Sequence, residues 1–213
     1  HGVRHIVFTS TTALYGAAQD ADAAAWVTEG TLPQPRTIYH RSKLAAEQLL
    51  IDAARQGGPA VTVLRMSRCF PEPAPAMAAY RLHRGVDARD VAQAHALALM
   101  RPPDVSRCCI VSGATPFEPG DARALLHDAP ALLRQRAPAL AEAFAQRGWA
   151  LPATIDRVYS PARAIAELGW APRFGFDEVL RQLDEQSSEV LPVSRRRGRP
   201  GLPGPGTISN SGR

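Results

Sequence analysis

The chain has 213 residues, 45% of them hydrophobic, and a formal net charge of +5. This length is enough for one core domain with a small appendage and too short for two full domains. The sequence contains neither a run of about 18 apolar residues nor a signal-peptide pattern, so we expect a cytoplasmic protein without a membrane contact.

The first predicted element is a strand over residues 3–8, a β-branched run that ends in a cluster of hydroxyls. Its composition is typical of a buried parallel strand. The hydroxyls that follow are Thr9, Ser10, Thr11 and Thr12. Ligands of open α/β sheets bind beyond the carboxyl ends of the strands, so these hydroxyls are candidate ligand contacts. For any one of the four, capping a turn before Tyr15 is the more common role.

The next predicted element is a helix over 37–54, which has apolar residues at helical spacing and stops at Gly57 and Gly58. It places Tyr39 and Lys43 on one face. Lys43 is the only lysine among 25 basic residues. An ammonium is a compact charge that favours a nearby phenolate, which suits the tyrosine to general acid/base work. By itself, the spacing also fits an ordinary surface pair.

Strands and helices alternate over the remainder of the chain. The predicted strands are 61–66, 108–112 and 157–159, and the predicted helices are 90–100, 161–168, 176–185 and one or two within 121–147, broken near Pro130 and Pro138. In the helix over 90–100 we expect Val91, Ala94, His95, Ala98 and Leu99 to face inward. This alternation predicts an α/β protein with a parallel sheet.

Three cysteines occur, Cys69, Cys108 and Cys109, and the last two lie in an apolar strand-like run. We expect them to act as small buried hydrophobic residues in a reducing compartment. The histidines and cysteines do not have the spacing of metal ligands, so no metal site is expected.

The sequence resembles the extended short-chain dehydrogenase/reductases, the NAD-dependent epimerase/dehydratase group. Five segments carry the resemblance in the family's order: 8–16 (FTSTTALYG), 39–43 (YHRSK), 61–65 (VTVLR), 85–92 (GVDARDVA) and 164–173 (AIAELGWAPR) with 176–180 (FDEVL). The resemblance covers about residues 1–185. It implies the C-terminal part of a Rossmann-type doubly wound parallel sheet, with a small and mostly helical substrate lobe.

The resemblance also implies catalytic roles for three residues. Tyr39 is the expected acid/base, and Lys43 is expected to bind the nicotinamide ribose and to lower the tyrosine pKa. Thr11, four places before Tyr15, is expected to hydrogen-bond the reacting oxygen. A hydride transfer at a carbinol carbon needs such a proton movement at the attached oxygen.

The implied cofactor is NAD or NADP, and the implied partner is a small-molecule substrate. The expected cofactor contacts are Thr9, Ser10, Tyr39 and Lys43. The expected substrate contacts are Thr12, Arg68 and Arg84. A homodimer through the helix that carries Tyr39 and extends to Arg55 is a further expectation. We divide the chain into the C-terminal part of an NAD(P)-binding domain (1–114), a substrate-binding lobe (115–185) and a disordered tail (186–213).

The expected tail holds the entire charge imbalance. From Ser194 onward there are five arginines and no acidic residue, so the other 20 basic residues match the 20 acidic ones. Its proline and glycine content predicts disorder. Arginine clusters can contact phosphate backbones, but we favour a solvated tail or a frame-shifted extension and expect no nucleic-acid partner.

Departures from the family pattern bear on the substrate. Arg68 stands where the family commonly has asparagine, and Pro71 stands where it has glycine, which removes an amide donor near the substrate. Arg81 and Arg84 are candidates to hold a diphosphate or a carboxylate. We expect an epimerase, dehydratase or similar oxidoreductase acting on a sugar nucleotide or another hydroxylated substrate. The alternatives are a ketone or aldehyde reductase of the same family and a non-catalytic remnant that binds or dimerises.

The family's glycine-rich turn, whose amides meet the cofactor pyrophosphate, does not occur in these 213 residues. We therefore expect a fragment or a truncated product. We predict that this chain alone binds NADH weakly or not at all, because the pyrophosphate contacts are missing. Titration of the 213-residue protein with NADH, followed by fluorescence, checks this; a clear micromolar affinity contradicts it.

Overall fold

The computed structural model describes residues 2–16 and 22–192. Within this part of the chain, three parallel strands form the main sheet in the order β1 (His5–Thr11), β3 (Ala60–Met66) and β4 (Arg107–Val111). All three are predicted from the sequence, with ends that differ by at most three residues. The expected α/β class with a parallel sheet is confirmed.

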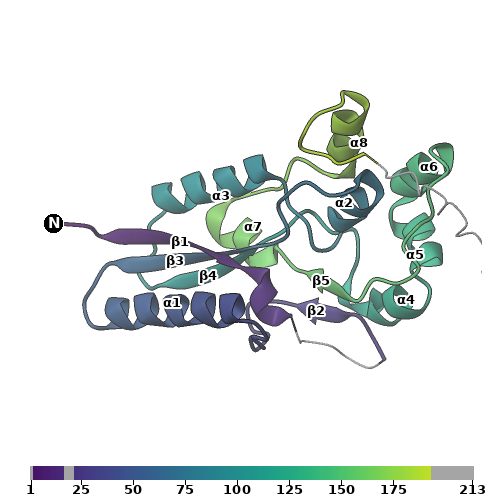
Figure 1. Ribbon diagram of the computed structural model, residues 1–213. Helices are drawn as coiled ribbons and strands as arrows, with labels where there is room; N and C mark the ends of the chain where they lie inside the picture. Colours follow the sequence, from purple (N-terminus) through teal and green to yellow (C-terminus); the bar gives the residue numbers. More distant parts are fainter. Residues whose placement is uncertain (1, 17–21, 193–213) are drawn as a thin grey trace, which may run out of the picture.

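Helices cover both faces of this sheet. Helix α1 (Ile38–Arg55) lies along one face and α3 (Ala88–Met100) along the other (Figure 1). The α1 helix begins where the Thr37 hydroxyl accepts a hydrogen bond from the His40 amide at 3.2 Å. It ends before Gly57, which has a φ of +91° that glycine adopts without strain. Both ends lie within one residue of the predicted helix.

The strand β1 extends further than predicted, and this corrects one expectation. Its last three residues are Thr9, Ser10 and Thr11, so these hydroxyls belong to the strand rather than to a following loop. Thr12–Tyr15 then forms a short 3-10 helix, η1. Among the described strands β1 is at the edge of the sheet, and it is mostly half-buried, whereas β3 is buried along its centre. An open edge of this kind favours association.

The inward face of α3 is partly as expected. Val91, Ala94 and Ala98 are buried in the core with Leu64 of β3. His95 is half-buried and hydrogen-bonded to Thr9. Leu99 is 60% exposed, so its assignment to the core is wrong. Leu99 lies at the margin of the apolar face of the helix, where a small rotation of the helix decides whether a side chain is buried.

A second group of elements lies beyond the carboxyl ends of the main sheet (Figure 1). The sequence did not reveal the strand β2 (Ala25–Val27), which pairs in parallel with β5 (Arg157–Tyr159), or the helix α2 (Ala74–Tyr80). The other elements of the group are η2 (Pro119–Asp121), α4 (Ala122–His127), α5 (Ala129–Arg136), α6 (Pro138–Gln146) and α8 (Phe176–Asp184). Pro130 and Pro138 lie in the first turns of α5 and α6, so the predicted breaks are confirmed.

The C-terminal signature returns to the main sheet. Helix α7 (Ala162–Leu168) packs against β4 and α3, and Trp170 is buried in the same core. The Trp170 indole donates to the carbonyl oxygen of Asp90 at 2.9 Å. The buried Asp90 carboxylate accepts from the amides of Arg173 at 2.9 Å and Phe174 at 3.1 Å. One residue at the start of α3 therefore holds the whole 170–174 turn.

The proposed division at 114/115 and the tail from 186 remain predictions. Within the expected tail, Leu191 exchanges backbone hydrogen bonds with Glu72 at 2.9 Å and Ala74 at 3.0 Å. Residues 193–213, with the arginine cluster, lie outside the described residues. No helix within 2–16 and 22–192 has both the length and the apolar character needed to cross a membrane.

We predict that Asp90→Ala lowers the free energy of unfolding by about 3 kcal/mol. The substitution leaves two partly buried amides of the 170–174 turn without their charged acceptor, and each such loss costs about 1–3 kcal/mol. Urea denaturation measures the change. The exposed Asp104→Ala is the matched control and should stay within about 0.5 kcal/mol; equal effects of the two substitutions contradict the role given to Asp90.

Candidate active site

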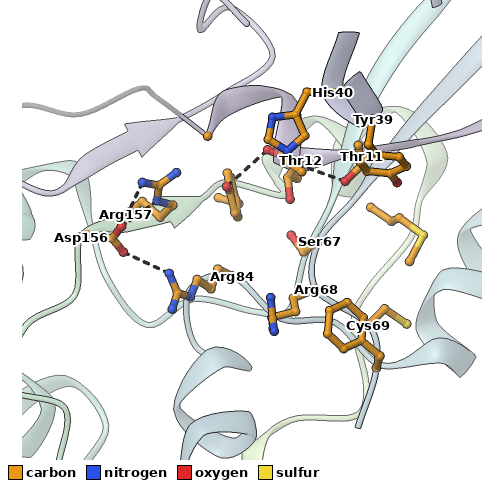
Figure 2. Close-up of a pocket in the computed structure, with 15 residues that line it drawn as sticks. Thr11, Thr12, Tyr39, His40, Ser67, Arg68, Cys69, Arg84, Asp156 and Arg157 are labelled. Carbon is orange, nitrogen blue, oxygen red and sulfur yellow. Dashed lines mark hydrogen bonds and ion pairs between the residues drawn. The ribbon is translucent and has the colours of Figure 1, made fainter. Parts of the chain in front are cut away.

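A cavity of about 570 Å³ lies at the carboxyl ends of β1 and β3. Its walls come from η1, the start of α1, the loop that follows β3, and the strand β5 (Figure 2). Residues as far apart in sequence as Thr11 and Tyr159 therefore share one cavity. This is the place at which open parallel sheets bind ligands.

Thr11 and Tyr39 both line this cavity (Figure 2). The Thr11 hydroxyl accepts a hydrogen bond from the Ala13 amide at 3.1 Å, which caps η1 and fixes the side chain. Its proton stays free to donate toward the cavity. The Tyr39 side chain is 52% exposed, on the first turn of α1. The structure thus brings together a fixed hydroxyl and an accessible phenol.

Lys43 lies one helical turn after Tyr39, on the same face of α1, but it is not among the residues that line the cavity. Its Nζ donates to the carbonyl oxygen of Thr9 at 2.9 Å and lies 5.0 Å from the centre of the Phe8 ring. The ammonium has three donors, and this bond uses one of them. Two donors remain for a ligand that approaches along β1.

The side chains of Thr9 and Ser10, predicted as cofactor contacts, have partners inside the protein. The Thr9 hydroxyl is 2.7 Å from Nε2 of His95, and the buried Ser10 hydroxyl donates to Glu47. These bonds tie β1 to α3 on one face of the sheet and to α1 on the other. The predicted cofactor role of both residues stays a prediction.

A buried ion pair holds α1 on the sheet. Arg65 of β3 donates from Nε and Nη2 to both carboxylate oxygens of Glu47, at 3.0 and 2.5 Å, and from Nη1 to the Tyr15 hydroxyl at 2.5 Å. Burial raises the pKa of Tyr15 to about 12, so its hydroxyl stays protonated. Glu47 follows Lys43 by one turn, and the pair therefore sets where Tyr39 and Lys43 stand relative to β1.

Both predicted substrate-contact arginines lie in the cavity wall. Arg68 forms an ion pair with Glu72, and its guanidinium lies 4.4 Å from the Phe70 ring centre. Arg84 stacks 4.2 Å from the ring centre of Tyr80 and pairs with Asp156 at 3.3 Å. The predicted contact Thr12 is also part of the wall, although it is 4% exposed.

Arg81 does not join this site. It is 4% exposed, it pairs with Asp87 at 3.0 Å, and it lies outside the cavity wall. The suggestion that it acts beside Arg84 on a diphosphate or a carboxylate of this site is therefore wrong. Both residues follow the end of α2 at Tyr80, but Arg81 pairs with Asp87 and Arg84 with Asp156, so the two side chains lie in different surroundings.

Sequence reasoning missed several residues of the wall. Asp156 and Arg157 line it from the start of β5, together with Tyr159, whose hydroxyl donates to the Thr12 carbonyl oxygen at 3.3 Å. Ser67 and His40 are further members. The sequence did predict the strand over 157–159. Its pairing with β2, which brings these residues to the cavity, cannot be deduced from a local pattern.

The cysteines are free in this structure, and Cys109 is fully buried in the core. Burial raises the pKa of both Cys108 and Cys109 to about 12, which keeps them as thiols. Cys69 lies in the wall of the cavity, and burial raises its pKa as well. Within the described residues, no three His, Cys, Asp or Glu side chains are grouped as a metal site would need.

Comparison with known proteins agrees with this architecture. Residues 1–78 match the NAD dependent epimerase/dehydratase family. Among solved structures, UDP-N-acetylglucosamine 4-epimerase from Bacillus cereus is 17% identical, with a TM-score of 0.56, over 86% of this chain and 63% of its own. UDP-glucose-4-epimerase from Stenotrophomonas maltophila, with bound NAD and formylated UDP-arabinopyranose, is 21% identical, with a TM-score of 0.53, over 84% and 62%.

A short-chain dehydrogenase/reductase superfamily protein from Agrobacterium tumefaciens with bound NAD is 16% identical, with a TM-score of 0.58, over 85% of this chain and 66% of its own. The chain spans less than two thirds of the length of each of these three structures. A search of curated proteins gave no match. The match over residues 1–78 agrees with the family resemblance seen in the sequence, and the chain has the Rossmann-type α/β fold of these structures.

His83, behind the cavity wall, makes the stability pH-dependent. It is 3% exposed, and its Nδ1 donates to the Arg157 carbonyl oxygen at 3.0 Å. Burial lowers its pKa from 6.5 to about 4. The unfolded chain therefore takes up a proton before the folded one as the pH falls from about 6.5 toward 4, and stability is lost over this window.

We predict that His83 accounts for a loss of about 3 kcal/mol in the free energy of unfolding between pH 7 and pH 4, since each pKa unit corresponds to about 1.4 kcal/mol. His83→Asn keeps a donor for the Arg157 carbonyl and removes the titration. Urea denaturation at both pH values should show a smaller pH dependence in the variant. The same pH dependence in both proteins contradicts this account.

Proposed function

We propose that the chain is the substrate-facing part of an NAD(P)-dependent oxidoreductase of the epimerase/dehydratase type. The observation that carries the proposal is the joint position of Thr11 and Tyr39 in one cavity beyond the strand ends, with the single ammonium of the chain on the same helix face. A hydroxyl donor, a phenol and an ammonium form a set suited to moving a proton at a carbinol or carbonyl oxygen.

The proposed cofactor is NAD or NADP, and the donor set fits its ribose. Tyr39 is accessible, and Lys43 has two donors beyond the one bonded to Thr9, so together they can hold two neighbouring hydroxyl groups. When bound, the nicotinamide supplies hydride transfer at the carbon that carries the reacting oxygen. Two of the similar structures are described with bound NAD, which supports this choice.

Tyr39 is the proposed acid/base, and Thr11 is the proposed donor to the same substrate oxygen. As the substrate alcohol becomes a carbonyl, the Tyr39 phenolate takes up the hydroxyl proton, and in the reverse direction the Tyr39 phenol returns that proton. The Ala13 amide holds Thr11 in one orientation, so its hydroxyl is preorganised for the charge that develops on the oxygen. The Lys43 ammonium favours the ionised phenol during this transfer.

The proposed substrate is a sugar nucleotide or a similar hydroxylated molecule with an anionic group. Arg68 and Arg84 present two guanidinium groups in the cavity wall, and paired guanidinium donors suit a diphosphate or a carboxylate. Phe70 is also part of the wall and is 55% exposed. This apolar surface favours the second candidate, a ketone or aldehyde reductase. Assays with UDP-glucose and with an aromatic ketone separate the two.

Lys43→Arg gives the sharpest test of the acid/base set. In the full-length protein, with conversion of UDP-glucose followed by chromatography, we expect the variant to fold normally and to lose most turnover. The bulkier guanidinium cannot occupy the point between the Thr9 carbonyl and the ribose. Tyr39→Phe, which removes the proton and keeps the ring, should lower turnover by a factor of about 10² to 10⁴.

Arg41→Lys is the matched control, because Arg41 is exposed on the same helix and the charge is kept. It should leave turnover unchanged. Circular dichroism and urea denaturation verify that Lys43→Arg changes stability by no more than about 0.5 kcal/mol. Undiminished turnover in Lys43→Arg or in Tyr39→Phe, with an active wild type, shows that these residues have no catalytic role.

We also propose that α1 contributes a homodimer contact. This contact is compatible both with an enzyme and with a non-catalytic binding or dimerising module. Ile38, Ala45 and Leu49 recur at a spacing that places them on one stripe of the helix, and all three are exposed. Ile38 is 79% and Leu49 is 71% exposed, so a second copy of the stripe would cover two large apolar side chains.

Leu49→Glu should shift the protein from dimer to monomer in sedimentation velocity, because two carboxylates would then face each other across the contact. Gln48→Glu, on the neighbouring exposed position, is the control with the same added charge and should leave the dimer intact. A wild-type protein that sediments as a monomer at all concentrations contradicts the proposed contact.

A further inference from the structure

A second cavity, of about 520 Å³, lies away from the candidate active site and shares no lining residue with it. It is enclosed by the end of α2, the loop after β4, the junction of α5 and α6, and the turn that leads into α8. Most of its wall is apolar; the larger apolar residues are Leu82, Pro116, Pro138, Pro172, Phe174 and Phe176. Its volume and wall are typical of a site for a small organic molecule.

Three arginines interrupt this apolar wall: Arg81, Arg136 and Arg173. Two of them have an Nε donor that is buried and has no hydrogen-bond partner among the described residues, namely Arg81 and Arg136. A buried donor without an acceptor costs free energy, and native proteins rarely leave one. An acceptor brought by a ligand would remove that cost.

The carboxylates near these arginines do not supply the missing acceptors. Arg81 is 4% exposed and donates to Asp87 at 3.0 Å, but Asp87 also accepts from Arg89 at 2.8 Å. Burial lowers the pKa of Arg81, as expected for a cation with too little countercharge. Arg136 donates from Nη2 to Asp121 at 3.1 Å and to Glu118 at 3.4 Å.

The third arginine and the remaining acid define the charge of the wall. Arg173 is exposed, and its guanidinium has no ion pair within the part of the chain that the structure describes. The one acid in the wall is Asp177, at the start of α8. Arg81 and Arg136 are paired with carboxylates outside the wall, so the donors left for an anion are the Arg173 guanidinium and the two unpartnered Nε groups.

We propose that this cavity is a second binding site, for an organic anion that joins a carboxylate to an apolar body. The carboxylate would accept from the unpartnered arginine donors, and the apolar body would lie against the proline and phenylalanine side chains of the wall. The site goes beyond the proposed oxidoreductase function and does not depend on it, since the two cavities have no residue in common.

Octanoate is a suitable probe, because it carries a carboxylate on a flexible apolar chain. Isothermal titration calorimetry of the 213-residue protein with octanoate should show saturable binding. 1-Octanol, which has the same chain without the charge, should bind at least about tenfold more weakly, because a hydrogen bond to a charged group contributes enough for this difference.

Two substitutions at the junction of α5 and α6 test the location of the site. Arg136→Met removes one donor and should weaken octanoate at least about tenfold. Arg134→Met, two residues earlier on the same helix, is exposed, lies outside the wall and removes the same charge, so affinity should be unchanged. Ala139→Trp fills the cavity from an exposed position without a change of charge and should also weaken binding.

Arg68→Met, in the first cavity, controls for binding at the candidate active site and should not alter the affinity. Absence of saturable binding to the wild type overturns the proposal. So does an affinity lost in Arg68→Met and kept in Arg136→Met, because the probe would then occupy the first cavity. If circular dichroism shows that Arg136→Met does not fold, Ala139→Trp is the test of the site. Unchanged octanoate affinity in Ala139→Trp overturns the proposal.

Discussion

The buried ion pair between Arg65 and Glu47 is the interaction on which the candidate active site depends. It joins the centre of β3 to the middle of α1, and through Tyr15 and Ser10 it reaches η1 and β1 as well. Loss of one partner of such a pair commonly costs about 3–5 kcal/mol, because the other charge is left buried. The hydrogen bonds between the Arg65 guanidinium and both Glu47 oxygens fix α1 relative to β3.

That position decides the chemistry available at the strand ends. Tyr39 and Lys43 precede Glu47 by two turns and one turn of α1, so the anchored carboxylate fixes both. Thr11 is fixed independently, by its bond to the Ala13 amide. Proton transfer needs donor and acceptor within hydrogen-bond reach, and the proposed role of Tyr39 and Thr11 therefore depends on these two separate anchors.

A second buried carboxylate, that of Asp90, joins helix α3 to the turn that follows α7. Asp90, at the start of α3, binds two amides of the turn after α7 and accepts the Trp170 indole on its own carbonyl. The same turn continues through Phe174 into the wall of the second cavity. The sequence signature around Trp170 therefore has a structural explanation. It holds the C-terminal segment against the sheet, and it forms part of the wall of the second cavity.

The sequence by itself determined the elements with strong local patterns and the residues that carry the family motifs. The three strands of the main sheet, the helix with Tyr39 and Lys43, and the proline-delimited helices all follow from periodicity and backbone restriction, which are local properties. Only the tertiary structure decided which residues contact one another. Arg84 lines the cavity and Arg81 does not, and Asp156 and Arg157 reach the site because β5 pairs with β2. The hydroxyls of Thr9 and Ser10 are hydrogen-bonded within the protein. The hydrogen bond from Tyr159 to Thr12 likewise joins residues 147 positions apart. Local patterns cannot encode such contacts, because the same short segment can pack in many registers until the whole core selects one.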